Sequence, residues 1–296
     1  MSFEKFLSRV TIRGQLIAET GLHIGTSVSA LDPSATDSPV IRDATGHPFI
    51  PGSSLKGALR AHMECLIRGL NCPKMWACDP LAAPCIPEKQ QNDRPGIKEI
   101  KAAAEKEATV NDHLDRFKYD QLLTSKILDA TCIACQLFGS PWLAAHVMVK
   151  DLFIAPEWWA GRLELRDGVG IDRDTGTARH GIKYDFEVAP AATRFGLEMV
   201  ADNAGDDLLG LLAVGLREME NQRVALGGKT TRGLGAVKLE LTEIEVVGDG
   251  AAEEIDGTGS TDLIDYFISG QGRRLREPAL HGYTHAKIQG LTKARL

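Results

Sequence analysis

Residues 51–60 read PGSSLKGALR, a pattern typical of a helix that begins after a break in the chain. The Pro-Gly pair ends the preceding segment, and the hydroxyl of Ser53 or Ser54 is suited to cap a helix N-terminus. The first turn of such a helix offers free backbone N–H groups, while Lys56 and, one turn on, Arg60 add positive charge. The stretch therefore predicts a helix start that can bind a phosphate group.

Further elements of the core follow from the spacing of apolar residues. Leucines at 55, 59, 66 and 70 continue the helix to about residue 70, and a second helix is expected over 206–220. Four segments read as strands: 10–18, 147–155, 195–201 and 237–247. The order β-α-β-β-α-β predicts an α+β protein with a ferredoxin-like core, the arrangement that RNA-recognition (RRM-like) domains also use.

The remaining segments interrupt or follow this core. Residues 71–131 are rich in Cys, Pro and charged residues and are expected to form an insertion with a helix near 98–106. A protruding hairpin is expected over about 162–190, around a polar turn at 172–176, and a short one over 39–50. We expect one domain over 1–248, then a linker and tail over 249–296 with one short helix.

Composition limits the classes of function. The 296 residues, 43% of them hydrophobic, can bury a large core. A net charge of −6 opposes non-specific nucleic-acid binding unless the basic residues cluster on one face. The chain has no run of eighteen apolar residues, and its start, MSFEK, lacks the features of a signal peptide. We therefore expect a cytoplasmic protein that does not insert into a membrane.

A glycine-rich loop at 227–235, GGKTTRGLG, has a composition suited to an anion. Its glycines let backbone amides approach a phosphate, and Lys229 and Arg232 supply charge. The simplest alternative is a tight turn between strands. Nucleotide-binding glycine motifs do not fit, because a strand rather than a helix follows.

Together, three stretches resemble the repeated backbone subunit of type III CRISPR effector complexes, a group within the RAMP (repeat-associated mysterious protein) superfamily. They are DSPVIRD at 37–43, PGSSLKGALR at 51–60 and the glycine-rich loop. In that superfamily a C-terminal loop of this kind contacts guide RNA. The resemblance and the charge pattern imply this set of RNA-binding residues: Ser53, Ser54, Lys56, Arg60, Arg173, Arg179, Gly227, Gly228, Lys229, Thr230, Arg232 and Gly233.

The resemblance gives the hairpin and one aspartate specific roles. The hairpin resembles the family's thumb, which wedges into the guide–target duplex and displaces a nucleotide, although an ordinary exposed hairpin is the simpler reading. Asp37 matches the aspartate that relatives need to cut target RNA. His23, Asp32 and Asp43 are lesser candidates, Asp43 because it has an evident turn role. Mg²⁺ or Mn²⁺ is the expected catalytic cofactor, and the 2′-hydroxyl of RNA the expected nucleophile.

The cysteines predict a structural zinc site. Cys132-x-x-Cys135 supplies half of a tetrahedral site, and the other half must come from the insertion. The spacing of Cys78 and Cys85 resembles a compact zinc loop, so we favour these four, with Cys72 as the alternate. Cys65 falls at a helical position and is expected in the core; buried thiols without metal are the simpler alternative.

The expected partners are guide CRISPR RNA, complementary target RNA, neighbouring RAMP subunits and a large polymerase-like subunit, in an antiviral ribonucleoprotein complex. Three alternatives stay open. The subunit could be catalytically silent, or it could be a RAMP-type guide-processing endoribonuclease that works without metal and often through histidine. It could also be a generic ferredoxin-type RNA-binding domain, which would carry exposed aromatic residues on a central strand.

Overall fold

The computed structural model describes residues 4–26, 36–91, 94–111, 113–248 and 263–295. Its centre is a five-stranded antiparallel sheet with the order β11-β10-β1-β9-β5. The strands are β1 (Arg9–Ala18), β5 (Val147–Val149), β9 (Arg194–Asp202), β10 (Val237–Val247) and β11 (Arg273–Leu275). The α+β class expected from the sequence is therefore confirmed.

Strand β1 lies in the middle because it can pair along its whole length on both sides. Residues 9–18 pair with β10, and 9–17 with β9. A register shift occurs between Arg13 and Gly14, where a Cβ atom on residue 14 would lie 2.5 Å from the carbonyl oxygen of Glu240. Glycine is therefore needed at this position, where the two backbones approach most closely.

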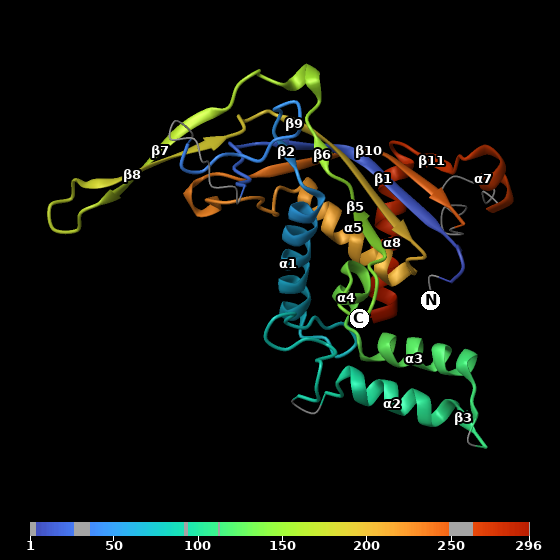
Figure 1. Cartoon of the computed structure of the whole chain (residues 1–296). Helices are drawn as coiled ribbons and strands as arrows, with labels where there is room; N and C mark the ends of the chain where they lie inside the picture. The colour runs from blue at the N-terminus through green and yellow to red at the C-terminus, as the bar shows by residue number, and fades with distance from the viewer. Residues whose placement is uncertain (1–3, 27–35, 92–93, 112, 249–262, 296) are drawn as a thin grey trace.

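Helices cover one face of the sheet (Figure 1). They are α1 (Gly52–Leu70), α4 (Ile133–Phe138), α5 (Asp206–Glu220) and α8 (Ala279–Arg295). The buried stripe of α1 is Leu55, Leu59, Met63 and Ile67. The predicted end near residue 70 is confirmed, although Leu66 and Leu70 are 38% and 52% exposed. The expectation that Cys65 lies in the core was wrong, because Cys65 is exposed.

The start of α1 and the strand expected over 147–155 both differ from the prediction, and one residue, Asp151, accounts for both differences. Pro51 is the N-cap residue, neither described serine hydroxyl caps the helix, and the N–H of Gly52 donates to Oδ1 of Asp151 at 2.8 Å. Since Asp151 turns to reach this helix, the strand expected over 147–155 is broken into β5 and β6 (Leu152–Phe153).

Strand β6 pairs with β2 (Phe49–Ile50), while Ile154, the residue after it, still bridges Phe195 of β9 in the central sheet. The short hairpin expected over 39–50 is consequently reduced to a turn at 43–47 with a single bridge between Arg42 and Pro48. A 3-10 turn, η1 (Pro156–Trp158), follows β6.

The long hairpin is formed by β7 (Glu164–Ile171) and β8 (Ala178–Val188), and it projects from the body of the molecule (Figure 1). The carboxylate of Asp172 accepts the N–H groups of Asp174 and Thr175 in the connecting turn. Gly168 leaves room for the ring of Tyr184 on the opposite strand, since a Cβ there would lie 2.2 Å from the ring. The hairpin and its polar turn are as predicted.

The insertion forms a second helical layer at the end of the molecule away from the hairpin (Figure 1). It contains α2 (Ile97–Ala108), α3 (Arg116–Ala130) and a small ladder of β3 (Thr109–Val110) with β4 (His113–Leu114). The helix expected near 98–106 is therefore present.

The tail contains more structure than its composition indicated. The expected linker falls almost wholly in 249–262, outside the described residues. Beyond it, α7 (Leu263–Ser269) is followed by β11, which extends the sheet, and by α8, which packs on α5. Lys287 and Arg295 of α8 pair with Asp206 and Asp207 at the start of α5, at 2.7 and 2.6 Å. Every helix in the described parts of the chain is too short or too polar to span a bilayer.

Candidate functional site

The segment that carries Asp37 is fastened to the base of the hairpin. The N–H of Asp37 donates to Oδ1 of Asp185 at 2.8 Å, and the N–H of Asp185 donates to Oδ2 of Asp37 at 3.0 Å. Next to this pair, Ser38 bridges Phe186 and accepts the N–H of Glu187 at 3.1 Å. The two aspartates therefore fix each other's backbone position at the root of β8.

Glu187 fastens the same segment at two further points. Its Oε2 accepts the N–H of Val40 at 3.0 Å, and its other oxygen pairs with the guanidinium of Arg42. Asp37 itself is exposed. Its Oδ1 accepts no hydrogen bond from the described residues, so one carboxylate oxygen is available to a ligand while the other holds the residue in place.

The glycine-rich loop packs against the same strand. The N–H of Gly228 donates to the carbonyl of His23 at 2.8 Å, and a Cβ on Gly227, where φ is 83°, would lie 2.4 Å from that oxygen. Nζ of Lys229 lies 4.4 Å from the ring centroid of Phe186. Close contact with His23 therefore requires glycine here and places Lys229 beside β8.

Arg232 lies in η2 (Thr230–Arg232) and hydrogen-bonds to the hydroxyl of Tyr184. Tyr184 and Phe186 alternate with Asp185 along β8, and successive side chains of a strand point to opposite faces. Lys229 and Arg232 therefore approach one face of β8, and Asp37 lies on the other. Gly227, Gly228, Thr230, Arg232 and Gly233 are exposed and Lys229 is half-buried.

The lesser catalytic candidates have structural surroundings. His23 is buried, with Nδ1 2.7 Å from the carbonyl oxygen of Glu187. The carboxylate of Asp43 accepts from the side chain and backbone of Thr45 and from the N–H of His47, and the Thr45 hydroxyl is the main reason that the pKa of Asp43 is lowered. Asp43 thus has the expected turn role. Asp32 lies outside the described residues.

Arg173 and Arg179 sit at the far end of the hairpin from Asp185, and both are exposed. Arg173 belongs to the turn after β7, and Arg179 is the second residue of β8. The structure therefore does not bring them into the region of Asp37. They occupy the projecting tip, where they are free to contact a separate ligand.

The start of α1 differs from the expected phosphate site. Nζ of Lys56 donates to the carbonyl of Val147 at 3.0 Å, and burial, followed by the charge of Arg60, lowers the pKa of Lys56. Arg60 points into the protein, where Nη2 lies 3.2 Å from Sγ of Cys135. Ser53 is exposed and Ser54 half-buried. Both cations are bonded to the protein and Asp151 accepts the first N–H of the helix, so RNA binding by Ser53, Ser54, Lys56 and Arg60 stays a prediction.

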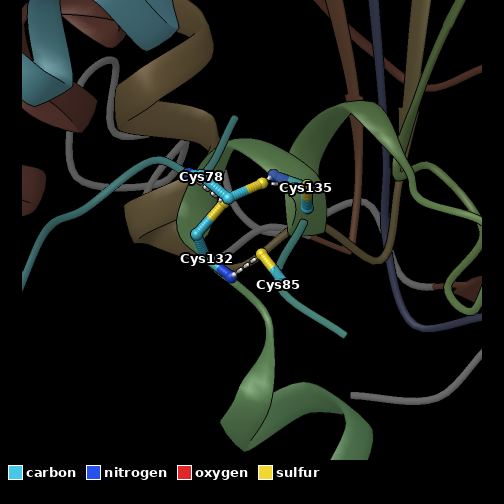
Figure 2. Close-up of side chains that lie close together, drawn as sticks. All are labelled: Cys78, Cys85, Cys132 and Cys135. Carbon is cyan, nitrogen blue, oxygen red and sulfur yellow. Dashed lines mark hydrogen bonds between the residues drawn. The ribbon is translucent and has the colours of Figure 1, made fainter. Parts of the chain in front are cut away.

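Four buried cysteines, Cys78, Cys85, Cys132 and Cys135, form a candidate metal centre (Figure 2). Their sulfur atoms all lie within 4.8 Å of one another. Four thiolates are the donor set of a closed, tetrahedral zinc site. Sγ of Cys72 instead donates to the carbonyl of Arg295 at 3.2 Å, so the structure brings together the four favoured cysteines and leaves the alternate, Cys72, outside the group.

Backbone N–H groups point at the cysteine sulfurs. Those of Cys78 and Cys135 lie 3.5 Å from Sγ of Cys132, and that of Cys132 lies 3.2 Å from Sγ of Cys85. The thiol of Cys135, then those of Cys78 and Cys85, lower the pKa of Cys132. N–H donors favour thiolates, which are the form that binds a metal. The cluster can therefore hold a metal ion, and zinc is compatible with it.

Sequence reasoning passed over Asp185 and Glu187, although both lie in the expected hairpin. The available signal was the alternation of acidic residues with Tyr184 and Phe186, which places the two carboxylates on one face of β8. What the sequence did not show is that this face meets Asp37 and the residues that follow it. That contact joins positions 148 apart in the chain.

Comparison with known proteins gives consistent results. A sequence model of the RAMP superfamily matches residues 15–238. The chain is 27% identical over 241 residues to the CRISPR system Cms endoribonuclease Csm3 of Methanocaldococcus jannaschii, covering 78% of each chain. It is 26% identical to the proteins of that name from Methanothermobacter thermautotrophicus (82% of this chain, 87% of the relative) and Enterococcus italicus (82% and 95%).

Proposed function

This chain belongs to the RAMP superfamily, and we propose that it is a guide-RNA-binding backbone subunit of a type III CRISPR complex that cleaves complementary target RNA. The observation that carries the proposal is the reciprocal bonding of Asp37 and Asp185 at the hairpin root. Relatives that bear the name endoribonuclease support the activity. The proposed partners are guide CRISPR RNA, target RNA, neighbouring RAMP subunits and a large polymerase-like subunit.

The finer fold assignment is supported by strand order. Without the insertion, the hairpin, the tail and the short elements β2, α4, β6, η1 and η2, the elements are β1, α1, β5, β9, α5 and β10, and the strands lie in the order β10-β1-β9-β5. This is the βαββαβ pattern of a ferredoxin-like domain. We propose residues 1–248 as the RAMP domain, with the insertion at 71–131 and the thumb-like hairpin at 162–190.

The site suits cleavage that uses the RNA's own 2′-hydroxyl. A nucleotide held out of the duplex can reach the in-line geometry that a regular helix forbids. Asp37 presents a free carboxylate oxygen, the donor type that Mg²⁺ and Mn²⁺ prefer, and a bound cation would offset charge at phosphorus. Asp185 and Glu187 would hold this carboxylate in place, while Lys229 and Arg232 bind phosphates of the guide.

The hairpin has the surface expected of a wedge. Four of its apolar side chains are largely exposed: Leu165, Val169, Ile171 and Ile182. Exposed apolar residues on a projecting element indicate contact with another molecule, and stacked bases offer an apolar surface. Arg173 and Arg179 at the tip would then contact phosphates on either side of the displaced nucleotide.

Two of the alternatives fit the structure less well. A metal-free, histidine-based nuclease has no support at His23, which is buried against Glu187 and Phe186. A generic ferredoxin-type domain would stack bases on its open sheet face. Here that face carries ion pairs of Arg13 with Glu198, Glu243 and Glu245. The remaining alternative, a catalytically silent subunit, predicts the same contacts, and an assay of target-RNA cleavage distinguishes it from an active subunit.

We expect the double variant Lys229→Ala, Arg232→Ala to bind guide RNA more weakly at all sequences and with a flatter salt dependence. Each lost phosphate contact lowers the slope of log affinity against log salt by roughly 0.7 for single strands, so two contacts predict about 1.4. Filter binding across a salt series measures this. Lys126→Ala, which removes a cation paired with Glu107 in the insertion, is the control. An unchanged slope in the double variant contradicts the assignment.

Replacement of Asp185 should separate its hydrogen bond from its charge. Asp185→Asn keeps an oxygen that accepts the N–H of Asp37 and is expected to retain most target cleavage. Asp185→Ala loses that acceptor, which should slow single-turnover cleavage by roughly tenfold or more because the catalytic segment is no longer held. Equal rates for the two variants would show that the bond to Asp185 does not position Asp37.

A further inference from the structure

A row of charged residues runs along α1 beside the cysteine cluster, from the half-buried Arg60 through the buried Glu64 to the exposed Arg68. Glu64 is only 5% exposed. Arg60, four residues earlier, donates from Nε to Oε1 of Glu64 at 2.7 Å, and Arg68, four residues later, lies 3.5 Å from Oε2. Residues four apart share one helix face, so Arg60, Glu64 and Arg68 form a continuous ladder.

The charged ladder (Arg60, Glu64 and Arg68) reaches both halves of the cysteine cluster. Nη2 of Arg60 donates to Sγ of Cys135 at 3.2 Å, and its Nη1 donates to the carbonyl of Gly139, where α4 ends, at 2.9 Å. Nη1 of Arg68 donates to the carbonyl of Cys78 at 3.1 Å. The two arginines therefore contact the Cys78 loop and the α4 segment at the same time.

Charge explains why arginine is suited to this place. A divalent metal with four thiolates carries a net charge of −2, and the four cysteines are buried. Buried charge is costly unless it is paired and hydrogen-bonded. The ladder contributes a net charge of +1 next to Cys135, and Glu64 keeps both guanidinium groups directed at the cluster.

We propose that the charged ladder supports the metal centre, and that Arg60 is a positioning residue that stabilises the Cys135 thiolate. The proposal rests on the four cysteines holding a metal. It gives Arg60 a role different from RNA binding, since each of its three guanidinium nitrogens is bonded within the protein. It also explains a buried glutamate on a helix face that otherwise packs through Leu59, Met63 and Ile67.

The test uses the full-length chain loaded with Co²⁺, whose thiolate charge-transfer band reports the cysteine ligands. Loss of a group that hydrogen-bonds a metal ligand typically weakens metal binding by about 10- to 100-fold. We expect this loss for Arg60→Met by chelator competition, together with a shifted charge-transfer band. Arg60→Lys keeps the positive charge without the forked donors of arginine, and its Co²⁺ affinity should fall several-fold. This variant tests the role of Arg60 even if Arg60→Met fails to fold.

Arg13→Met is the matched control, because it removes an arginine that is ion-paired in the sheet, away from the cysteines. It should leave Co²⁺ affinity and spectrum unchanged. Wild-type affinity and spectrum in both Arg60 variants, or an equal loss in Arg13→Met, would overturn the role of the ladder. A wild-type chain without a thiolate band would overturn the metal centre itself, which is a separate outcome.

Discussion

Replacing Asp37 with alanine is expected to abolish cleavage of complementary RNA while leaving guide binding and target affinity intact or slightly improved. The exposed carboxylate adds negative charge where a phosphate must approach, so its removal cannot weaken binding electrostatically. Loss of a residue that acts on the reacting groups typically costs 10²-fold or more in rate. Asp37→Ala should therefore lose target-RNA cleavage without losing RNA binding.

The assay incubates the assembled complex with end-labelled complementary RNA, with Mg²⁺ or with EDTA. The wild type should cut only with the cation and leave a 2′,3′-cyclic phosphate, the product of 2′-hydroxyl attack. Asp43→Ala is the control, since Asp43 is a half-buried aspartate with a turn role on the same segment, and it should cut normally. Full cutting by Asp37→Ala would place the site elsewhere, and an inert wild type would favour the silent subunit.

Loss of one cysteine from the cluster should have the largest effect on stability. The free energy of binding a structural zinc ion is also free energy of folding. If the free energy of unfolding falls by about 4 kcal/mol, the melting temperature of a domain of this size should fall by roughly 8–16 °C. We expect Cys132→Ser to lose the metal and much of its solubility, because Cys132 begins α4 and accepts two backbone N–H groups.

Elemental analysis of protein purified without added metal should give about one zinc ion per chain for the wild type. Cys65→Ser is the matched control, because Cys65 is an exposed cysteine on α1 outside the cluster. It should keep both metal and melting temperature. A metal-free wild type that melts at the same temperature with and without chelator would contradict a structural zinc site.

Where local pattern and tertiary packing agreed, the sequence predicted the elements well. Helix α5 and strand β10 have the bounds that their periodicity indicated, 206–220 and 237–247. Both lie against the main core, so the apolar stripe of each coincides with the face that it buries. The four cysteines were chosen because the spacing of Cys78 and Cys85 resembles a compact zinc loop, and the structure brings these four together.

The sequence-based predictions failed where a polar contact with a distant segment determines the local structure. Asp151 breaks a strand to reach Gly52, and Glu64 takes a buried position on α1, where it pairs with two arginines that bond onward to Cys135 and Cys78. Helix α8 was missed because its buried face has few apolar residues, Leu280, Tyr283 and Leu291, and includes Lys287, which pairs with Asp206 of α5. The contacts that Asp151, the two arginines and Lys287 make with distant segments leave no periodic signal in the sequence.

The same reasoning explains the incomplete prediction of the candidate site. Asp37, Lys229 and Arg232 were identified from a resemblance in sequence motifs, and the structure places them around β8. Asp185 was not identified, because its role depends on a contact across 148 positions of the chain. Arg60 was assigned to RNA because it lies one turn from a helix start, whereas its guanidinium faces Cys135.

The most direct test of the central proposal is to sequence the RNA that copurifies with the protein from a host expressing the neighbouring genes. A guide-binding backbone subunit predicts RNAs of defined length that carry CRISPR-repeat sequence at one end. A preparation without RNA, or with random fragments of host transcripts, would contradict the assignment as a guide-bound subunit.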